Sequence, residues 1–179
     1  MKRLLLPLLF TFLAMPAYAK EPVRIIEVTV TKVSDGDTVH VTDKAGKEVK
    51  VRLYGIDAPQ ANKTDPTSAL QSKGQPYGEE ASKALLGKLS GKVVRLDVMG
   101  TGKNEKLIAI VWLGKRNINL EMVAEGWAWA HRQYLDKRDS PEYIKLEENA
   151  RLKRLGLWQQ SNPQPPWEFR KIQNIKGLL

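Results

Sequence analysis

The sequence contains no cysteine among its 179 residues. A disulfide framework is therefore excluded, and the fold has to be stabilised by its hydrophobic core. A lipid anchor on an N-terminal cysteine is excluded for the same reason. The chain has two histidines, His40 and His131. Because their separation fits no metal-ligand spacing, we expect both to be surface residues or hydrogen-bonded polar residues.

Long apolar runs are also scarce, and the clearest one lies at the N-terminus. Two basic residues precede an apolar stretch at 4–16, and the following Ala-Tyr-Ala fits a small-x-small cleavage site. This pattern is typical of a secretory signal peptide, and the run is too short for a stable membrane anchor. We therefore expect residues 1–19 to be a signal peptide. Residues 20–179 would then form one exported domain, periplasmic or secreted, without a membrane attachment.

Acidic residues are in the minority. The chain has 29 lysines and arginines against 20 aspartates and glutamates, which gives a formal net charge of +9. The excess persists when the two basic residues of the expected signal peptide are removed. Such an excess attracts polyanions, either nucleic acid or an anionic membrane surface. The alternative is that the charge serves solubility alone, so on its own it favours nucleic acid only weakly.

Hydrophobic periodicity predicts five strands and three helices. Apolar residues alternate with polar residues in the expected strands and recur at helical spacing in the expected helices. We expect strands at 23–33, 38–42, 48–56, 92–99 and 106–113, and helices at 77–89, 117–126 and 140–154. Residues 60–76 are expected to form a long exposed loop, and residues 160–179 a tail that is proline-rich at 162–166.

The order of these elements favours one fold class. Five short strands with one helix inserted after the third are typical of a small closed barrel of the OB type. A parallel sheet is not expected, because helices do not alternate with single strands. We therefore predict an α+β fold, a five-stranded OB-fold barrel with three helices, formed by a single domain at 20–179.

Two segments at strand ends carry the residues of greatest chemical interest. Asp35-Gly36-Asp37 is a tight turn, and the segment 51–59 carries Arg52 and Asp57. Turns at strand ends present carboxylates and main-chain carbonyls, which are the oxygen ligands that calcium prefers. Arginine binds phosphate through a planar fork of donors. We expect Asp37 and Asp57 to be metal ligands and Arg52 to bind phosphate, although each motif alone also fits an ordinary turn or surface residue.

The full set of motifs is more specific than any single one. The segments are Asp35-Gly36-Asp37-Thr38, 51–59 (VRLYGIDAP), 75–81 (QPYGEEA), 119–123 (NLEMV), 126–129 (GWAW), 154–158 (RLGLW) and 162–168 (NPQPPWE). In this combination the chain, over roughly 23–171, resembles the staphylococcal-nuclease-like (thermonuclease) family. That family has an OB barrel with three helices, which agrees with the element order above.

The resemblance implies roles for individual residues. In the family, a calcium ion is held by two aspartates, which fall on Asp37 and Asp57, and an arginine that falls on Arg52 binds the scissile phosphate. A base-stacking tyrosine falls on Tyr134. We expect Arg52, Tyr134 and two lysines to contact nucleic acid, either DNA or RNA. These lysines are Lys103 and Lys106.

The chain departs from the family at two catalytic positions. Gln60 stands where the family has an acidic group that positions or deprotonates the attacking water. Gln60 can orient a water but cannot accept its proton, and a general base contributes roughly 10²–10⁴ in rate. Lys106 stands where the family has a second arginine, and it keeps the charge but lacks the bidentate fork. Asp65, in the long loop, is either a displaced base or an ordinary solvated residue.

Two functions of different classes remain open. The intact pair of Asp37 and Asp57, with Arg52, favours an exported calcium-dependent nuclease that hydrolyses DNA or RNA at a full or reduced rate. Gln60 and Lys106 favour a nucleic-acid-binding module with a degenerate nuclease site. An OB-fold interaction protein without a nucleic-acid role is disfavoured by the resemblance. We lean towards the enzyme, because metal-holding carboxylates have no obvious use in plain phosphate binding, and we expect a monomer.

Overall fold

The computed structural model describes residues 21–64 and 71–176. The expected signal peptide and Asp65 therefore lie outside the described residues. Within the described ranges, no helix is both long and apolar enough to cross a membrane.

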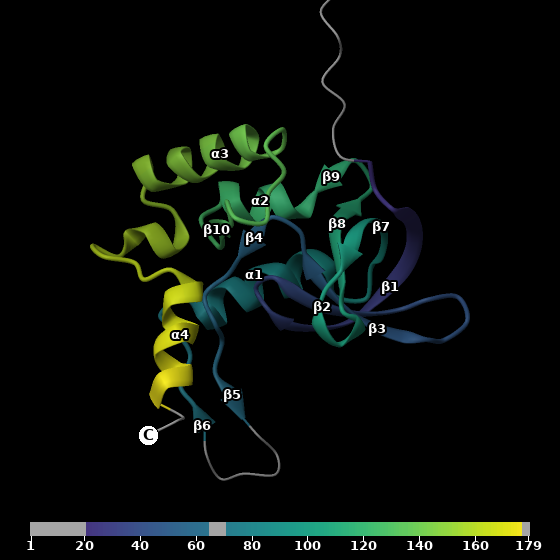
Figure 1. Ribbon diagram of the computed structural model, residues 1–179, viewed down its shortest axis with the longest axis horizontal. Helices are drawn as coiled ribbons and strands as arrows, with labels where there is room; N and C mark the ends of the chain where they lie inside the picture. Colours follow the sequence, from purple (N-terminus) through teal and green to yellow (C-terminus); the bar gives the residue numbers. More distant parts are fainter. Residues whose placement is uncertain (1–20, 65–70, 177–179) are drawn as a thin grey trace, which may run out of the picture.

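A closed barrel of five strands forms the centre of the fold (Figure 1). The strands pair in the order β3-β2-β1-β7-β8, and a parallel pairing of β3 with β8 closes the ring. The barrel strands are β1 (Arg24–Asp35), β2 (Thr38–Thr42), β3 (Glu48–Leu53), β7 (Val93–Thr101) and β8 (Leu107–Leu113). Alternate residues fill the interior, as with Val28 and Val30 of β1, which are buried. The predicted OB-type barrel is confirmed.

The described residues form four α-helices around the barrel, rather than the predicted three. They are α1 (Gly78–Leu89), α2 (Ile118–Ala124), α3 (Ser140–Leu152) and α4 (Pro166–Lys176). The first three match the sequence-based ranges within a few residues. The fourth lies in the segment that we expected to be a proline-rich tail. Proline is favourable in the first turn of a helix, so Pro166 begins α4 rather than preventing it.

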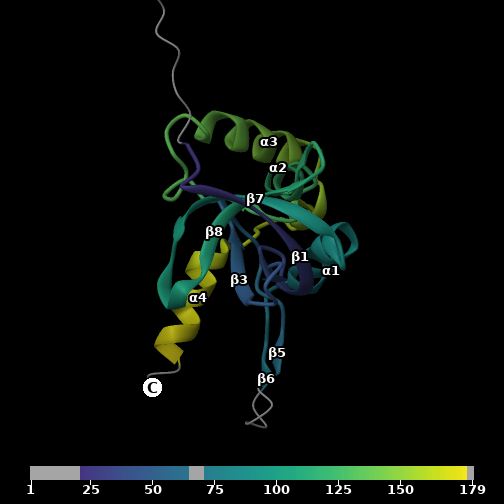
Figure 2. The same cartoon turned by 90° about the vertical axis from the view of Figure 1, so that its right-hand side faces the viewer.

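Short elements connect these parts. They are β4 (Ile56–Asp57), β5 (Lys63–Thr64), β6 (Gln71–Ser72), β9 (Arg116–Asn117), β10 (Trp129–Ala130) and the 3₁₀ turns η1 (Lys103–Glu105) and η2 (Gly156–Gln159). The expected long loop at 60–76 thus contains the β5–β6 pair. Figures 1 and 2 show α3 at one end of the molecule, while α4 and the β5–β6 pair extend from the other.

Two turns bring Asp37, in the β1–β2 turn, close to Asp57 of β4. The expected strand 48–56 is interrupted at Gly55, whose φ of +74° suits glycine, and the chain turns there into β4. At Gly36 a Cβ atom would lie 2.7 Å from Ala81 Cβ and 2.8 Å from Ala58 Cβ. Only glycine therefore lets the β1–β2 turn approach both α1 and the segment that follows Asp57.

Asn119 fixes the end of β3 against β8 and α2. Its side chain is fully buried, accepts a hydrogen bond from the Val111 N–H at 3.0 Å and donates to the carbonyls of Tyr54 at 2.9 Å and Ala109 at 3.1 Å. These bonds satisfy main-chain groups at the point where the chain leaves the barrel for β4. The Asn119 amide thereby stabilises the turn that positions Asp57.

We predict that Asn119→Ala lowers the free energy of unfolding by about 2–4 kcal/mol, because it leaves buried main-chain groups without their partner. Urea denaturation followed by tryptophan fluorescence measures this change. Asn149→Ala, an exposed site on α3, is the matched control and should change stability by less than about 0.5 kcal/mol. Equal stabilities for both variants would contradict the role assigned to Asn119.

Candidate active site

The carboxylates of Asp37 and Asp57 converge on a single guanidinium nitrogen. Arg52 Nη2 donates to Asp37 Oδ2 at 3.0 Å and to Asp57 Oδ1 at 2.7 Å. Arg52 lies opposite Thr38 across the β2–β3 pair, so the strand register places it beside Asp37. Asp57 reaches the same point from β4, which pairs with β10. The structure thus brings together the three residues that the sequence singled out as metal ligands and phosphate binder.

Both carboxylates are buried and hydrogen-bonded. Asp57 is 0% exposed and Asp37 is 1% exposed. Asp37 accepts hydrogen bonds from the Thr38 hydroxyl at 2.7 Å and from the Ala58 N–H at 3.2 Å. A buried charge is tolerated only when it is paired and hydrogen-bonded. The site therefore depends on positive charge placed directly against these two residues.

Arg170 of α4 supplies much of that charge, and sequence reasoning missed it. Its Nη1 donates to Asp57 Oδ1 at 2.9 Å and its Nη2 to Asp57 Oδ2 at 2.5 Å, which makes a bidentate ion pair. Asp57 thus binds two guanidinium groups. The proline pair at 165–166 followed by WEFRKIQNIK was a usable signal for a helix, because proline favours a first helical turn. No local pattern, however, pointed from that helix to Asp57.

An aromatic stack holds α4 against this site. The Trp167 ring stacks on His131 with centroids 5.0 Å apart and planes 7° apart, and it meets the Trp129 ring edge-to-face at 5.6 Å. Trp167 and Arg170 are three residues apart, so they share one face of the helix. The stack therefore directs Arg170 towards Asp57.

The charges and the burial of this site shift several pKa values. The negative charge of Asp37, and then that of Asp57, raises the pKa of Arg52 against the opposing effect of burial. Burial raises the pKa of Asp57, and Arg170 and Arg52 oppose that rise. Burial lowers the pKa of His131 to about 4, assisted by the positive charges of Arg52 and Arg170. His131 Nδ1 lies 3.9 Å from Asp57 Oδ2, but its ring is neutral at pH 7, so this contact is not an ion pair.

A cleft of about 590 Å³ opens beside the site. Its lining includes Arg52, Arg170, Lys103, Lys106, His131 and Tyr134. The Tyr134 side chain is 67% exposed, and its ring meets that of His131 edge-to-face at 4.5 Å. Cationic side chains with an exposed ring are typical of a groove for single-stranded nucleic acid. Lys106 thus lies on the same cleft as Arg52, and its contact with phosphate stays a prediction.

Gln60 lies beside the site but is not among the described residues that line the cleft. Its side-chain Nε2 donates to the Ala58 carbonyl at 3.3 Å, and its N–H donates to Gln75 Oε1 at 3.1 Å. Gln75 in turn donates to the Gln164 carbonyl at 3.1 Å, just before α4. Gln60 thus belongs to a chain of amides that connects the Asp57 turn to the C-terminal segment. Its action on a water stays a prediction.

The donor set of Asp37 and Asp57 fits a hard divalent cation such as calcium, which prefers oxygen ligands. Both carboxylates hydrogen-bond to one Arg52 nitrogen, at 3.0 and 2.7 Å, so their oxygens converge on one point. Among the described residues, no three side chains of the Asp, Glu, His and Cys types gather as a metal cluster. Main-chain oxygens or water would therefore complete the coordination. Arg52 and Arg170 supply the positive charge at these carboxylates in this structure.

The family of the chain follows from comparison with known proteins. A family model described as staphylococcal nuclease homologue matches residues 50–160, which is more than half of the chain and includes Arg52 and Asp57. The chain belongs to this family. The family expected from the sequence motifs is thus confirmed, and with it the assignment to a phosphodiesterase of the nuclease type.

Individual relatives extend the similarity over most of the chain. An uncharacterized endonuclease of Haemophilus influenzae is 37% identical over 168 residues, which cover 94% of this chain and 83% of that protein. Protein ParB of Escherichia coli is 34% identical over 171 residues, which cover 90% of this chain and 85% of that protein. Staphylococcal-like nuclease CAN1 of Arabidopsis thaliana is 34% identical over 125 residues, covering 70% of this chain and 34% of the plant protein.

We predict that the His131 ring stays neutral down to about pH 4 in calcium-free solution, which NMR titration of its ring protons measures. The folded pKa lies below the value of about 6.5 in unfolded chains. Unfolded chains therefore bind more protons between these values, so the stability that His131 contributes is present above pH 6.5 and is lost as the pH falls towards 4. Arg170→Gln should raise the midpoint, since it removes a neighbouring positive charge. A midpoint near 6.5 in the wild-type protein would contradict this prediction.

Proposed function

We propose that this protein is an exported, calcium-dependent endonuclease that hydrolyses phosphodiester bonds in DNA or RNA. The observation that carries the proposal is the convergence of Asp37, Asp57 and Arg52 beside a cleft lined by cationic side chains. Membership in the nuclease family supports the same reaction. The Haemophilus influenzae relative, which is named an endonuclease, supports cleavage within a strand.

Each residue of the site has a role in this proposal. Asp37 and Asp57 would hold the calcium ion, which when bound supplies positive charge beside the phosphate and acidifies water. Arg52 binds the scissile phosphate, because its planar fork matches phosphate oxygens and its raised pKa keeps it charged. Burial of the two carboxylates excludes bulk water and strengthens their electrostatic interactions.

The cleft accounts for the recognition of a polyanion. Lys103 and Lys106 neutralise phosphates on either side of the cleaved bond, and their contribution weakens as salt concentration rises. The exposed Tyr134 ring offers a surface on which a base can stack, independently of sequence. This pairing of cations with an exposed ring fits a single-stranded or locally opened substrate.

A nucleic-acid-binding module with impaired hydrolysis is the second candidate function. The specific observation that favours it is the Gln60 amide, which donates to the Ala58 carbonyl and has no carboxylate to accept a proton from water. The cleft would serve binding equally well in either case. The two candidates therefore differ in turnover, and not in the nucleic acid that they bind.

Export is also part of the proposal, and it rests on the N-terminal sequence. The basic start, the apolar stretch at 4–16 and the Ala-Tyr-Ala site at 17–19 support removal of residues 1–19. Expression of the full-length gene followed by N-terminal sequencing of the exported product tests it. A product that begins at Lys20 supports export, and an uncleaved cytoplasmic product would exclude it.

The first test of function is cleavage of single-stranded DNA and RNA with calcium and then with EDTA. We predict that calcium supports cleavage and EDTA abolishes it. Asp37→Asn and Asp57→Asn should each lower the rate by roughly 10²-fold or more, the size of losing one electrostatic stabiliser, and weaken calcium binding in calorimetry. The control Glu142→Gln removes an exposed carboxylate on α3 and should leave both unchanged. Tight binding without cleavage in calcium would instead favour the binding module.

The second test concerns Gln60. We predict that Gln60→Glu raises the calcium-dependent rate by roughly 10-fold or more, because a carboxylate at this position can accept the proton of the attacking water. Single-turnover kinetics measure the effect on chemistry. Gln159→Glu adds the same charge at an exposed position of η2 and should not raise the rate. An unchanged rate for Gln60→Glu would assign the proton to another group.

A further inference from the structure

Arg170 occupies the carboxylate that a cation would need. It donates to both oxygens of Asp57, and Oδ1 also accepts from Arg52. Because Asp57 is fully buried, a cation can coordinate it only when the Arg170 guanidinium moves aside. Cation and guanidinium therefore compete for the same carboxylate. Arg170 lies beyond residue 160, where the family-model match ends.

The displaced guanidinium would remain in the cleft. The helix that carries it is anchored by the stack of Trp167 on His131 and by the edge contact of Trp167 with Trp129. These contacts lie one helical turn before Arg170 and are made between aromatic rings, not with the Asp57 carboxylate. Arg170 already lines the cleft together with Arg52 and Lys106. Rotation of its side chain alone therefore leaves its charge on the surface that faces a bound polyanion.

Electrostatics decides which partner the displaced guanidinium takes. A divalent cation on Asp57 repels a guanidinium at contact distance, whereas a phosphate attracts it. The arginine fork fits phosphate oxygens in the same bidentate way in which it fits a carboxylate. The lysines of the cleft act as point charges and lack a bidentate fork. Among the described residues of the cleft, the proposed function gives a bidentate phosphate contact to Arg52 alone.

We propose that Arg170 is a second phosphate-binding arginine, which pairs with Asp57 in the cation-free protein and with a substrate phosphate when a cation occupies Asp57. The exchange rests on the proposed function, because it requires cation binding at Asp57. It makes α4 part of the nucleic-acid site. It also makes calcium and nucleic acid promote each other's binding, since each one favours the same position of Arg170.

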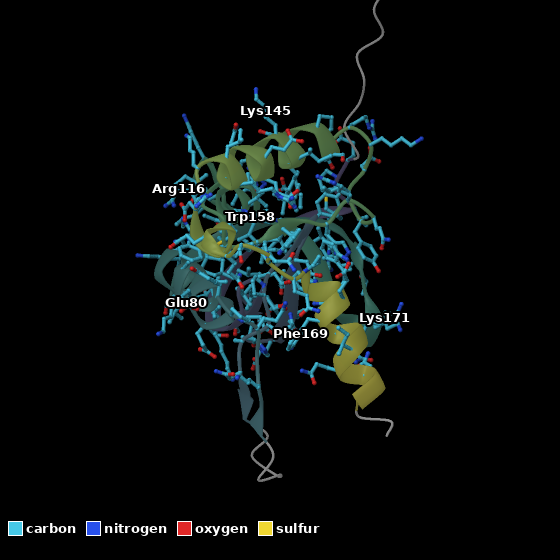
Figure 3. All side chains as sticks on the ribbon, turned by 90° about the vertical axis from the view of Figure 1, so that its left-hand side faces the viewer. Glu80, Arg116, Lys145, Trp158, Phe169 and Lys171 are labelled. Carbon is cyan, nitrogen blue, oxygen red and sulfur yellow. The ribbon has the colours of Figure 1, made fainter. Side chains whose placement is uncertain are left out.

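Calorimetry on the purified protein tests the exchange in two titrations. The first adds calcium alone, and the second adds a phosphorothioate-linked oligothymidylate to the calcium-saturated protein. Both are run on the wild type, Arg170→Ala, Arg170→Lys and Lys171→Ala. Figure 3 labels Phe169 and Lys171, the neighbours of Arg170 on α4. Lys171 is exposed, so Lys171→Ala is a matched control for the loss of one positive charge from this helix.

The two titrations should move in opposite directions for Arg170→Ala. Calcium should bind roughly 10-fold more tightly, because the competing guanidinium is gone, and the oligothymidylate should bind roughly 10-fold more weakly, about the effect of one charge-assisted contact. Arg170→Lys should restore part of the oligothymidylate affinity. Lys171→Ala should stay within about twofold of the wild type in both titrations.

Several results would overturn the proposal. Oligothymidylate affinity of Arg170→Ala equal to the wild type would show that Arg170 only pairs with Asp57. Equal losses of oligothymidylate affinity for Arg170→Ala and Lys171→Ala would show that Arg170 contributes only its positive charge. If the wild-type protein binds calcium and cleaves DNA, either of these results leaves the proposed function intact. If the wild-type protein does not bind calcium, both the exchange and the proposed function are contradicted. If Arg170→Ala melts at a much lower temperature than the wild type, the Arg170→Lys titrations replace it as the test. Arg170→Lys that binds calcium and oligothymidylate with wild-type affinity would contradict a bidentate role for Arg170.

Discussion

The burial of the Asp57 carboxylate is the constraint on which the rest of the site depends. A charge with no solvent contact has to be compensated within the protein, and removing one partner of such a buried pair costs about 3–5 kcal/mol. Two parts of the chain supply the compensation: Arg52 from the barrel and Arg170 from the terminal helix. The β2–β3 register, the turn at Gly55 and the docking of α4 are therefore linked through one carboxylate.

In the proposed reaction, the same constraint lets one site bind both a cation and an anion. Asp37 and Asp57 are held together by the same Arg52 nitrogen that the proposed reaction assigns to the phosphate. A calcium ion would take over the compensation of both carboxylates and release guanidinium groups towards the cleft. The neutral ring of His131 fits this exchange, because it packs against Trp167 without adding a further charge beside Asp57.

Much of the barrel and of the Asp37–Arg52–Asp57 centre could be predicted from the sequence, because strand alternation and turn residues are local signals. The resemblance to the nuclease family, and not a local pattern, singled out Lys106, which directly precedes β8. The contact of Arg170 with Asp57 spans 113 positions in the sequence, and no periodicity connects the two. The helix α4 was not predicted, because the prolines at 163–166 favour an irregular tail, whereas Pro166 begins the helix. The placement of His131 also depends on that helix, so its burial could not be predicted either.

A crystal structure of the protein with calcium and a phosphorothioate-linked dinucleotide is the most direct test of cation binding between Asp37 and Asp57. The predicted result is a calcium ion coordinated by both carboxylates, at ligand distances of about 2.3–2.6 Å, with Arg52 and Arg170 turned to the phosphate. Calcium bound elsewhere, with Arg170 still paired to Asp57 and the dinucleotide outside the cleft, would contradict both the metal site and the exchange.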